Sequence, residues 1–333
     1  MLNFPHAGSS AHAALTVIPG TDAVPDVALT PAQAELAAGL RGPFASISPK
    51  YLYDELGSKL FEAICELPEY YPTRVEAGIH TRYKAQIADA CGRGVTLIDL
   101  GAGNCAKAAS LFSALGPAQY IPVDISAEYL HAAVAGLQQR HPAIPMLPLA
   151  LDFSTTLELP VSVRTRRRLF FYPGSSIGNF TPIEAGAMLR RMRAACGSEG
   201  GVLLGVDLIK DKKVLDAAYD DALGVTAAFN LNVLRHANRL LGADFDLRQW
   251  RHLGFFNREL GRVEMHLEAR QAVTVHWHGE ARRFIQGERI HTENSYKYTP
   301  EAFLKMLSAA GFADAQVWTD PDGHFAVIHA RAQ

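Results

Sequence analysis

The sequence predicts an α/β protein with a mostly parallel sheet and a second, mixed part, and three observations lead to that expectation. Short apolar runs alternate with helical patterns between residues 95 and 208. The first run, Val95 to Leu100, passes directly into a glycine turn and then a helical pattern, as buried parallel strands do. After Leu208 the alternation stops, and helical and then antiparallel patterns follow, which indicates a second structural unit.

The pattern predicts each element in turn. The core strands are expected at 95–100, 120–124, 145–150, 169–172 and 201–208, and its helices at 76–90, 108–115, 126–137 and 182–195. Outside the core we expect helices at 31–40, across most of 211–241 and at 300–310, antiparallel strands at 262–268, 272–277 and 282–285, and a closing hairpin of 315–319 with 325–330. Thr30 and Thr181 each stand before a proline, the expected order for an N-cap and first helical residue.

Composition narrows the class of protein. The 333 residues are 48% hydrophobic and 20% charged, which is normal for a globular chain with a sizeable core. A net charge of -2 gives no electrostatic case for binding nucleic acid or an anionic membrane. No apolar run approaches the roughly 20 residues that span a bilayer, and the start of the chain lacks a signal-peptide pattern. The four cysteines are scattered, so we expect a reducing, cytoplasmic location. We also expect a monomer that binds small molecules.

The turn after the first strand carries the first functional signal. Gly101 and Gly103 permit a tight turn and close approach to a ligand, and Asp124 ends the next strand, where a carboxylate can accept from ribose hydroxyls. The pattern Gly-x-Gly-x-x-Ala also fits a dinucleotide fingerprint, so a nicotinamide-dependent oxidoreductase remains an alternative. Asp99, just before the first glycine, resembles instead the acidic-x-Gly-x-Gly loop of S-adenosylmethionine-dependent methyltransferases.

Several blocks in order make a more specific resemblance. They are Leu67 to Arg74, Gly174 to Asn179, Ala218 to Asp221 leading into Gly224 to Asn230, Arg262 to Met265, and Thr292 to Tyr298. With these blocks, the chain resembles the histidine-specific N-alpha-methyltransferases of ergothioneine biosynthesis over nearly everything after the N-terminal lead-in. Asn104, Cys105 and Ala106 depart from the Thr, Ser and Glu that are more familiar in that family's cofactor loop, whereas Lys107 is retained.

The resemblance implies a Rossmann-like S-adenosylmethionine-dependent methyltransferase sheet joined to a mixed α+β substrate domain. The implied divisions are a flexible lead-in at 1–27, N-terminal helices of the substrate domain at 28–75, the methyltransferase core at 76–208, an insertion completing the substrate domain at 209–290, and a C-terminal return to the core sheet at 291–333.

The resemblance also implies a set of cofactor residues. They are Tyr53, Gly101, Lys107, Asp124, Asp152 and Phe153. In these roles Asp124 would accept from the ribose hydroxyls, while Lys107 and Tyr53 would bind the cofactor's carboxylate. Asp152 would accept from the adenine amino group, and Phe153 would pack against the ring.

The implied substrate residues divide by the part of the amino acid that they contact. Tyr70, Asn179 and Tyr219 would hold the α-amino and carboxylate groups and so act as the catalytic set. Gly174 would let the backbone come close; Phe229 and Met265 would form walls. Glu293 and Ser295 would engage the two imidazole nitrogens, one as acceptor and one as hydroxyl partner.

The implied activity is successive methyl transfer from S-adenosylmethionine to the α-amino nitrogen of L-histidine, giving trimethylhistidine (hercynine) and S-adenosylhomocysteine. Relatives within the resemblance methylate other aromatic amino acids of the indole type, and a non-catalytic amino-acid sensor would keep the same fold. We expect no metal, because His276 and His278, although on one face of a predicted strand, lack nearby carboxylate or cysteine partners in the sequence.

Overall fold

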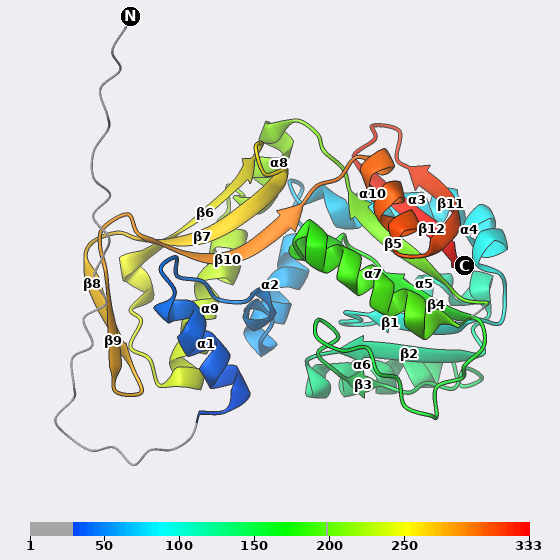
Figure 1. Ribbon diagram of the computed structural model, residues 1–333, viewed down its shortest axis with the longest axis horizontal. Coiled ribbons are helices and arrows are strands. Elements are labelled where there is room, and N and C mark those ends of the chain that lie inside the picture. Colours follow the sequence, from blue (N-terminus) through cyan, green and yellow to red (C-terminus); the bar gives the residue numbers. More distant parts are fainter. Residues whose placement is uncertain (1–28, 198) are drawn as a thin grey trace, which may run out of the picture.

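A seven-stranded sheet organises the larger part of the molecule (Figure 1). The computed structural model describes residues 29–333 except 198, so the predicted lead-in at 1–27 lies outside the described residues. The strands are β1 (Thr96–Leu100), β2 (Gln119–Asp124), β3 (Leu149–Ala150), β4 (Arg168–Tyr172), β5 (Gly201–Asp207), β11 (Phe312–Thr319) and β12 (Phe325–Ala332). Their order is β11-β12-β5-β4-β1-β2-β3; β1 to β5 are parallel, and β12 is antiparallel to both of its neighbours, β5 and β11.

Helices cover both faces of this sheet because its strands are apolar on both sides. Every residue of β1 is buried; Ile98 packs with α7 (Pro182–Cys196) and α10 (Pro300–Ala309), whereas Leu97 packs on the opposite face. The opposite layer consists of α3 (Tyr71–Arg82), α4 (Lys84–Cys91), α5 (Ala106–Leu115) and α6 (Ala127–Arg140). This arrangement confirms the predicted α/β class.

A smaller antiparallel sheet and its own helices form the second part (Figure 1). The sheet has the order β10-β7-β6, and a separate hairpin pairs β8 with β9. The elements are α1 (Pro31–Arg41), the 3-10 helix η1 (Pro49–Leu52), α2 (Glu55–Cys65), α8 (Lys212–Tyr219), α9 (Val225–Leu241), η3 (Leu247–Gln249), β6 (Trp250–Asn257), β7 (Arg262–Ala269), β8 (Val273–Trp277), β9 (Glu280–Phe284) and β10 (Arg289–Tyr296). N-terminal and mid-chain helices share one apolar core with these strands, so segments far apart in sequence fold together.

Helix starts follow the capping signals. Thr30 and Thr181 both form capping boxes, with Gln33 and Glu184 respectively, and a proline occupies the first turn of each helix. The helix expected at 76–90 is two helices, of which the first begins already at Tyr71 because Pro72 is compatible with a first turn.

Three other expectations needed correction. The third strand is only Leu149–Ala150 rather than 145–150, since Pro145 and Pro148 cannot donate to a strand ladder. The helical stretch 211–241 breaks after Tyr219. Asp221 then accepts from the backbone amides of Val225 and Thr226, which stabilises the start of a second helix, α9. Strands β6 and β10 were not among the expected strands, although β6 alternates in burial along its length.

Strand β10 links the two parts. It crosses the predicted boundary at residue 290, pairs with β7 over Arg289–Tyr296, and packs against η2 (Ser176–Asn179), which follows β4 of the large sheet. The predicted division of the chain into units stays a prediction. Among the described residues, no helix combines the length and apolar character needed to cross a membrane.

Candidate active site

The carboxyl ends of the parallel strands gather the predicted cofactor residues at one edge of the large sheet. From β1 the chain order runs outward to β2 and β3 on one side and to β4 and β5 on the other, so β1 and β4 flank the topological switch point. Ligands of open α/β sheets bind in the crevice outside this point. The turn after β1 lies there, with Gly101 at φ 69° and Gly103 at φ 51°, conformations that favour glycine.

Two aspartates shape that turn in different ways. Asp124, at the end of β2, accepts from the backbone amide of Gly103 at 3.0 Å and from that of Ser126 at 3.0 Å. Asp99 lies inside the sheet, where burial raises its pKa to about 7 and the Tyr120 hydroxyl donates to it at 2.7 Å. Asp99 therefore supports the turn from beneath, and Asp124 is the carboxylate at the open edge.

Lys107 joins the cofactor edge to the loop after β4. Its Nζ lies 2.7 Å from Glu76 Oε2, and the other oxygen of Glu76 accepts from the Gly174 backbone amide at 2.8 Å. Burial alone would lower the pKa of Lys107, but the Glu76 carboxylate raises it above its usual value. The lysine side chain remains 41% exposed, so a charged and reachable ammonium group stands beside Gly174.

The predicted adenine contacts are partly engaged within the protein. Asp152 accepts from Ser154 and lies 3.2 Å from Lys50 of η1; although burial opposes it, these partners lower the pKa of Asp152. Phe153 packs edge-on against Tyr172 at 5.7 Å and lies next to Gly101. Phe153 thus borders the glycine turn, whereas Asp152 offers an acceptor that Lys50 and Ser154 already share.

A pocket beside this edge contains every predicted substrate residue. Its walls are Tyr53, Phe61, Ile64, Tyr70, Gly174, Ser175, Ser176, Asn179, Ala218, Tyr219, Thr226, Phe229, Met265, Glu293 and Ser295. They come from both parts of the molecule. One side consists of Tyr53 directly after η1, Tyr70 directly before α3, and residues of α2, α8, α9, β7 and β10; the other side is the loop with η2 after β4. The structure places Tyr53, expected at the cofactor, in the wall of this pocket.

Aromatic rings form much of the pocket wall. Tyr53 packs edge-on against Phe61 and Phe229, each at 5.5 Å, and Tyr70 lies 6.0 Å from Phe61 and 6.1 Å from Tyr219. Burial holds the pKa values of Tyr53 and Tyr70 well above the usual range, so both hydroxyls stay protonated. The wall therefore offers neutral hydroxyls and ring faces, which attract cations.

Glu293 is the one carboxyl group among these lining residues. It is buried on β10 opposite Met265 of β7, and two residues before Ser295, so both β10 side chains project to the same face. Burial raises the pKa of Glu293 to about 7, while Lys297 and a hydrogen bond with Asn179 act in the opposite direction. Glu293 is thus poised to change charge near neutral pH.

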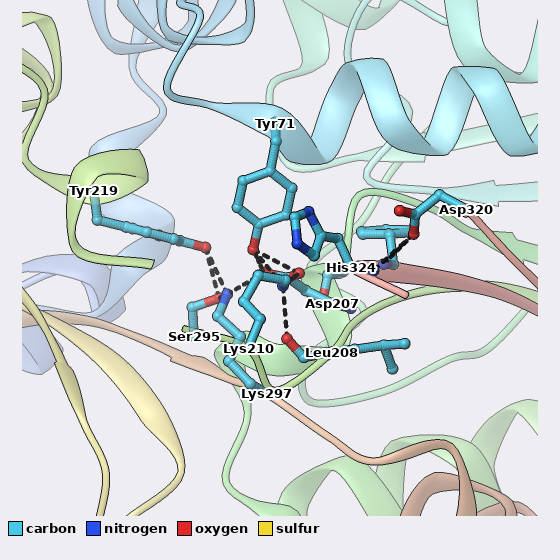
Figure 2. Close-up of polar contacts among 11 residues, drawn as sticks. Tyr71, Asp207, Leu208, Lys210, Tyr219, Ser295, Lys297, Asp320 and His324 are labelled. Atoms are coloured by element: carbon cyan, nitrogen blue, oxygen red, sulfur yellow. Dashed lines mark hydrogen bonds and ion pairs between the residues drawn. The ribbon is translucent and has the colours of Figure 1, made fainter. Parts of the chain in front are cut away.

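Behind the pocket lies a buried ionic network (Figure 2). Asp207, the last residue of β5, pairs with Lys297 at 2.7 Å and Lys210 at 2.5 Å, and accepts from the Tyr71 hydroxyl at 2.7 Å. Lys297 in turn donates to the Tyr219 hydroxyl at 3.0 Å and to Ser295 Oγ at 2.8 Å. A charge at the end of a core strand therefore connects to two hydroxyls that line the pocket.

Comparison with known proteins identifies the family. The sequence pattern described as "Histidine-specific methyltransferase, SAM-dependent" matches residues 32–332. The chain belongs to this family. It is 41% identical to Histidine N-alpha-methyltransferase of Mycolicibacterium smegmatis and 40% identical to that of Mycobacterium tuberculosis, in both cases over 87% of this chain and 92% of the relative. It is also 32% identical to Ergothioneine biosynthesis protein 1 of Neurospora crassa, over 80% of this chain and 31% of that longer protein.

Membership in the histidine-specific methyltransferases confirms the resemblance and removes the nicotinamide alternative. Several wall and network residues were nevertheless not predicted, among them Phe61, Thr226, Asp207 and Lys297. Phe61 is three residues from Ile64 and could have been found on the same helical face. Asp207 could also have been found from the sequence, because it is an acidic residue near the end of the apolar run 201–208.

Proposed function

We propose that this chain transfers methyl groups from S-adenosylmethionine to the α-amino nitrogen of L-histidine, three times in succession, giving hercynine in the first step of ergothioneine biosynthesis. One observation carries the proposal: Glu293, Ser295, Tyr70 and Asn179 line a single pocket that also contains Gly174, beside Lys107 at the cofactor edge. A Cβ on Gly174 would lie 3.0 Å from Lys107 Nζ, so the two sites adjoin.

The residues at the sheet edge fit S-adenosylmethionine by their chemistry. Asp124 would accept from the ribose hydroxyls, the turn at Gly101 would permit close approach of the cofactor, and Phe153 would border the adenine. The ammonium of Lys107 would pair with the cofactor's carboxylate while keeping its bond to Glu76. When bound, the sulfonium supplies an activated methyl group, so the protein has little acid–base chemistry to add.

The protein's own contribution is orientation and the exclusion of water. A neutral amine must face the methyl carbon on the side away from the sulfur, and holding two reactants in line supplies much of the acceleration. Tyr70 and Asn179 would position the α-amino and carboxylate groups from the wall of the pocket. Because Tyr70 stays neutral, its hydroxyl would act as a hydrogen-bond partner rather than as a base. The ring faces of Phe61 and Phe229 would accommodate the cation as methyl groups are added.

Glu293 and Ser295 would recognise the imidazole ring of the substrate through hydrogen bonds. Ionised Glu293 accepts from the imidazole N–H, and the Ser295 hydroxyl donates to the other nitrogen. An indole carries an N–H but no acceptor nitrogen, so it would satisfy only one of the two groups. This difference favours histidine over the indole-type substrates.

A methylation panel tests the proposal. Purified protein is incubated with S-adenosylmethionine and each of the twenty common amino acids, and products are identified by mass spectrometry. We expect mono-, di- and trimethylated histidine and no methylated tryptophan. Failure to methylate histidine would refute the proposal, and methylation of tryptophan alone would assign the indole-type activity instead. Binding of S-adenosylhomocysteine without any turnover of amino acids would identify a sensor.

A further inference from the structure

Lys297 is a fully buried ammonium group whose hydrogen-bonding capacity is completely used. Its side chain is 0% exposed, and Nζ contacts Asp207 Oδ2 at 2.7 Å, Ser295 Oγ at 2.8 Å and the Tyr219 hydroxyl at 3.0 Å (Figure 2). An ammonium group has three N–H donors and no acceptor. Each contact therefore takes one donor, and both hydroxyls must accept from Lys297.

Counting the remaining hydrogens fixes what the two hydroxyls can offer to a ligand. Tyr219 and Ser295 also bond to each other, with 2.8 Å between their oxygens. Each hydroxyl has one hydrogen, so one of the two hydrogens fills this mutual bond and the other is free. A phenol is the more acidic hydroxyl and the better donor, whereas an alcohol oxygen accepts two hydrogen bonds readily. Tyr219 therefore donates to Ser295, whose two lone pairs are then both occupied.

We propose that Lys297 is a positioning residue that makes Ser295 a hydrogen-bond donor, and never an acceptor, toward the substrate ring. The inference rests on the proposed function and explains how its ring specificity arises. Ser295 retains only its hydrogen for the pocket, and Glu293 two residues away supplies an acceptor when ionised. The pair accepts a ring with one donor and one acceptor nitrogen, and an indole would leave the Ser295 hydrogen unpartnered, which is unfavourable in a buried site.

Asp207 keeps Lys297 in the charged form that this role requires. Burial alone would lower the pKa of Lys297, but Asp207 raises it above its usual value, so all three donors are present at neutral pH. Lys210 contacts the same carboxylate, and its Nζ otherwise bonds the Tyr71 hydroxyl at 2.6 Å and the Leu208 carbonyl at 2.6 Å. Lys210 is thus a matched control, because it belongs to the same buried network but donates to neither pocket hydroxyl.

The test compares two amino acids in the same pocket. Calorimetry on the full chain saturated with S-adenosylhomocysteine gives the affinities for L-histidine and L-2-thienylalanine, whose five-membered ring has no nitrogen. The measured quantity is the ratio of the two affinities, which a general loss of stability does not change. We expect Ser295→Ala to lower this ratio by about 5- to 10-fold, the value of one net hydrogen bond. Lys297→Met should lower it by part of that factor, because Ser295 keeps its hydrogen but can then donate it to Tyr219 instead of the ring.

The two effects should not add. Because Lys297 acts on the substrate ring only through the Ser295 hydroxyl, the double variant Ser295→Ala/Lys297→Met should match Ser295→Ala alone, and Lys210→Met should keep the wild-type ratio. If Lys297→Met does not fold, Lys297→Met/Asp207→Asn removes the uncompensated carboxylate and is expected to give the same lowered ratio. An unchanged ratio in the Lys297 variants, or an equal fall in Lys210→Met, would overturn the inference. A wild-type ratio near one would instead contradict histidine specificity itself.

Discussion

At the scale of single residues, burial sets the protonation states of the ionisable side chains that line the pocket. Glu293 carries a pKa near 7, whereas its tyrosine neighbours remain neutral because burial raises their pKa values. Glu293 and Tyr70 could be predicted from the sequence because each lies inside a distinctive block. Lys297 lies inside the same block as Glu293, yet its role depends on Asp207, ninety residues earlier, and only folding brings the two together.

Replacing Glu293 by glutamine should reduce histidine binding without affecting the cofactor. The amide keeps the size of the side chain but loses the charge-assisted hydrogen bond, so we expect about a 10- to 100-fold weaker affinity for histidine. Calorimetry should show S-adenosylhomocysteine bound as in the wild type. The wild-type affinity should be highest well above pH 7, where Glu293 is ionised, and should fall as Glu293 takes up a proton around and below pH 7. Equal losses for both ligands would contradict the assigned role.

The same substitution should stabilise the fold at high pH. The folded pKa of Glu293 lies above that of an unfolded glutamate, so the folded state binds the extra proton and wild-type stability falls as pH rises from about 4.5 to beyond 7. A shift to about 7 corresponds to at most about 3 kcal/mol. Urea denaturation should therefore show Glu293→Gln gaining stability over the wild type at pH 8.5 relative to pH 5. A difference between the two proteins that does not vary with pH would argue against this.

At the scale of elements, the site depends on where helices break and where strands touch. Tyr219 lines the pocket because α8 ends at this residue, and the helical pattern of 211–241 did not reveal that break. Asp221 and Gly224 could have indicated this break in the sequence, but helix interiors tolerate both residue types at modest cost. The parallel strands were predictable because burial on both faces requires continuous apolar runs, whereas the pairing of β10 with β7 depends on distant segments.

Contact between η2 and β10 should be sensitive to one methyl group. A Cβ on Gly178 would lie 2.7 Å from the Tyr296 carbonyl oxygen and 3.2 Å from its nitrogen, so backbone must move. We expect Gly178→Ala to displace Asn179 from Glu293 and to weaken histidine binding by about 10-fold or more, as small misplacements in active sites do. S-adenosylhomocysteine affinity, measured by calorimetry, should change little.

Gly78 provides the matched control. It lies within α3, and a Cβ there meets nothing within 4 Å. Gly78→Ala should leave both affinities unchanged and stabilise the protein by about 0.5–1 kcal/mol, because alanine is the better helix former. If Gly178→Ala behaved in the same way, the tight contact with β10 would have no bearing on binding.

At the scale of the whole molecule, the two parts meet through buried charges as well as through polar contacts at the surface. Lys50 reaches Asp152, and Glu62 accepts from Asn104 at 3.2 Å and from Tyr129 at 2.6 Å. Deeper inside, Asp207 of the large sheet pairs with Lys297 directly after β10. Asn104 of the cofactor loop thus forms part of the contact with α2. That the enzyme is a cytoplasmic monomer stays a prediction.

Breaking the buried network should lower stability far more than breaking a surface pair. Asp207→Asn leaves two buried lysines without their carboxylate, and removing one partner of a buried pair costs about 3–5 kcal/mol. Urea denaturation at pH 7 should show this loss. In Lys212→Met, which removes the partly exposed pair with Asp216, the change should not exceed about 1 kcal/mol. Similar effects from the two variants would mean that the Asp207 network contributes little to joining the parts.

The aromatic wall of the pocket has a consequence for the order of events. A primary ammonium holds its place by donating hydrogen bonds, whereas each added methyl removes a donor and enlarges the surface that rests against Tyr53, Phe61 and Phe229. Partly methylated intermediates should therefore dwell in the site at least as long as the starting amino acid. The enzyme would then work processively, exchanging the spent nucleotide between rounds while the amino acid stays in place.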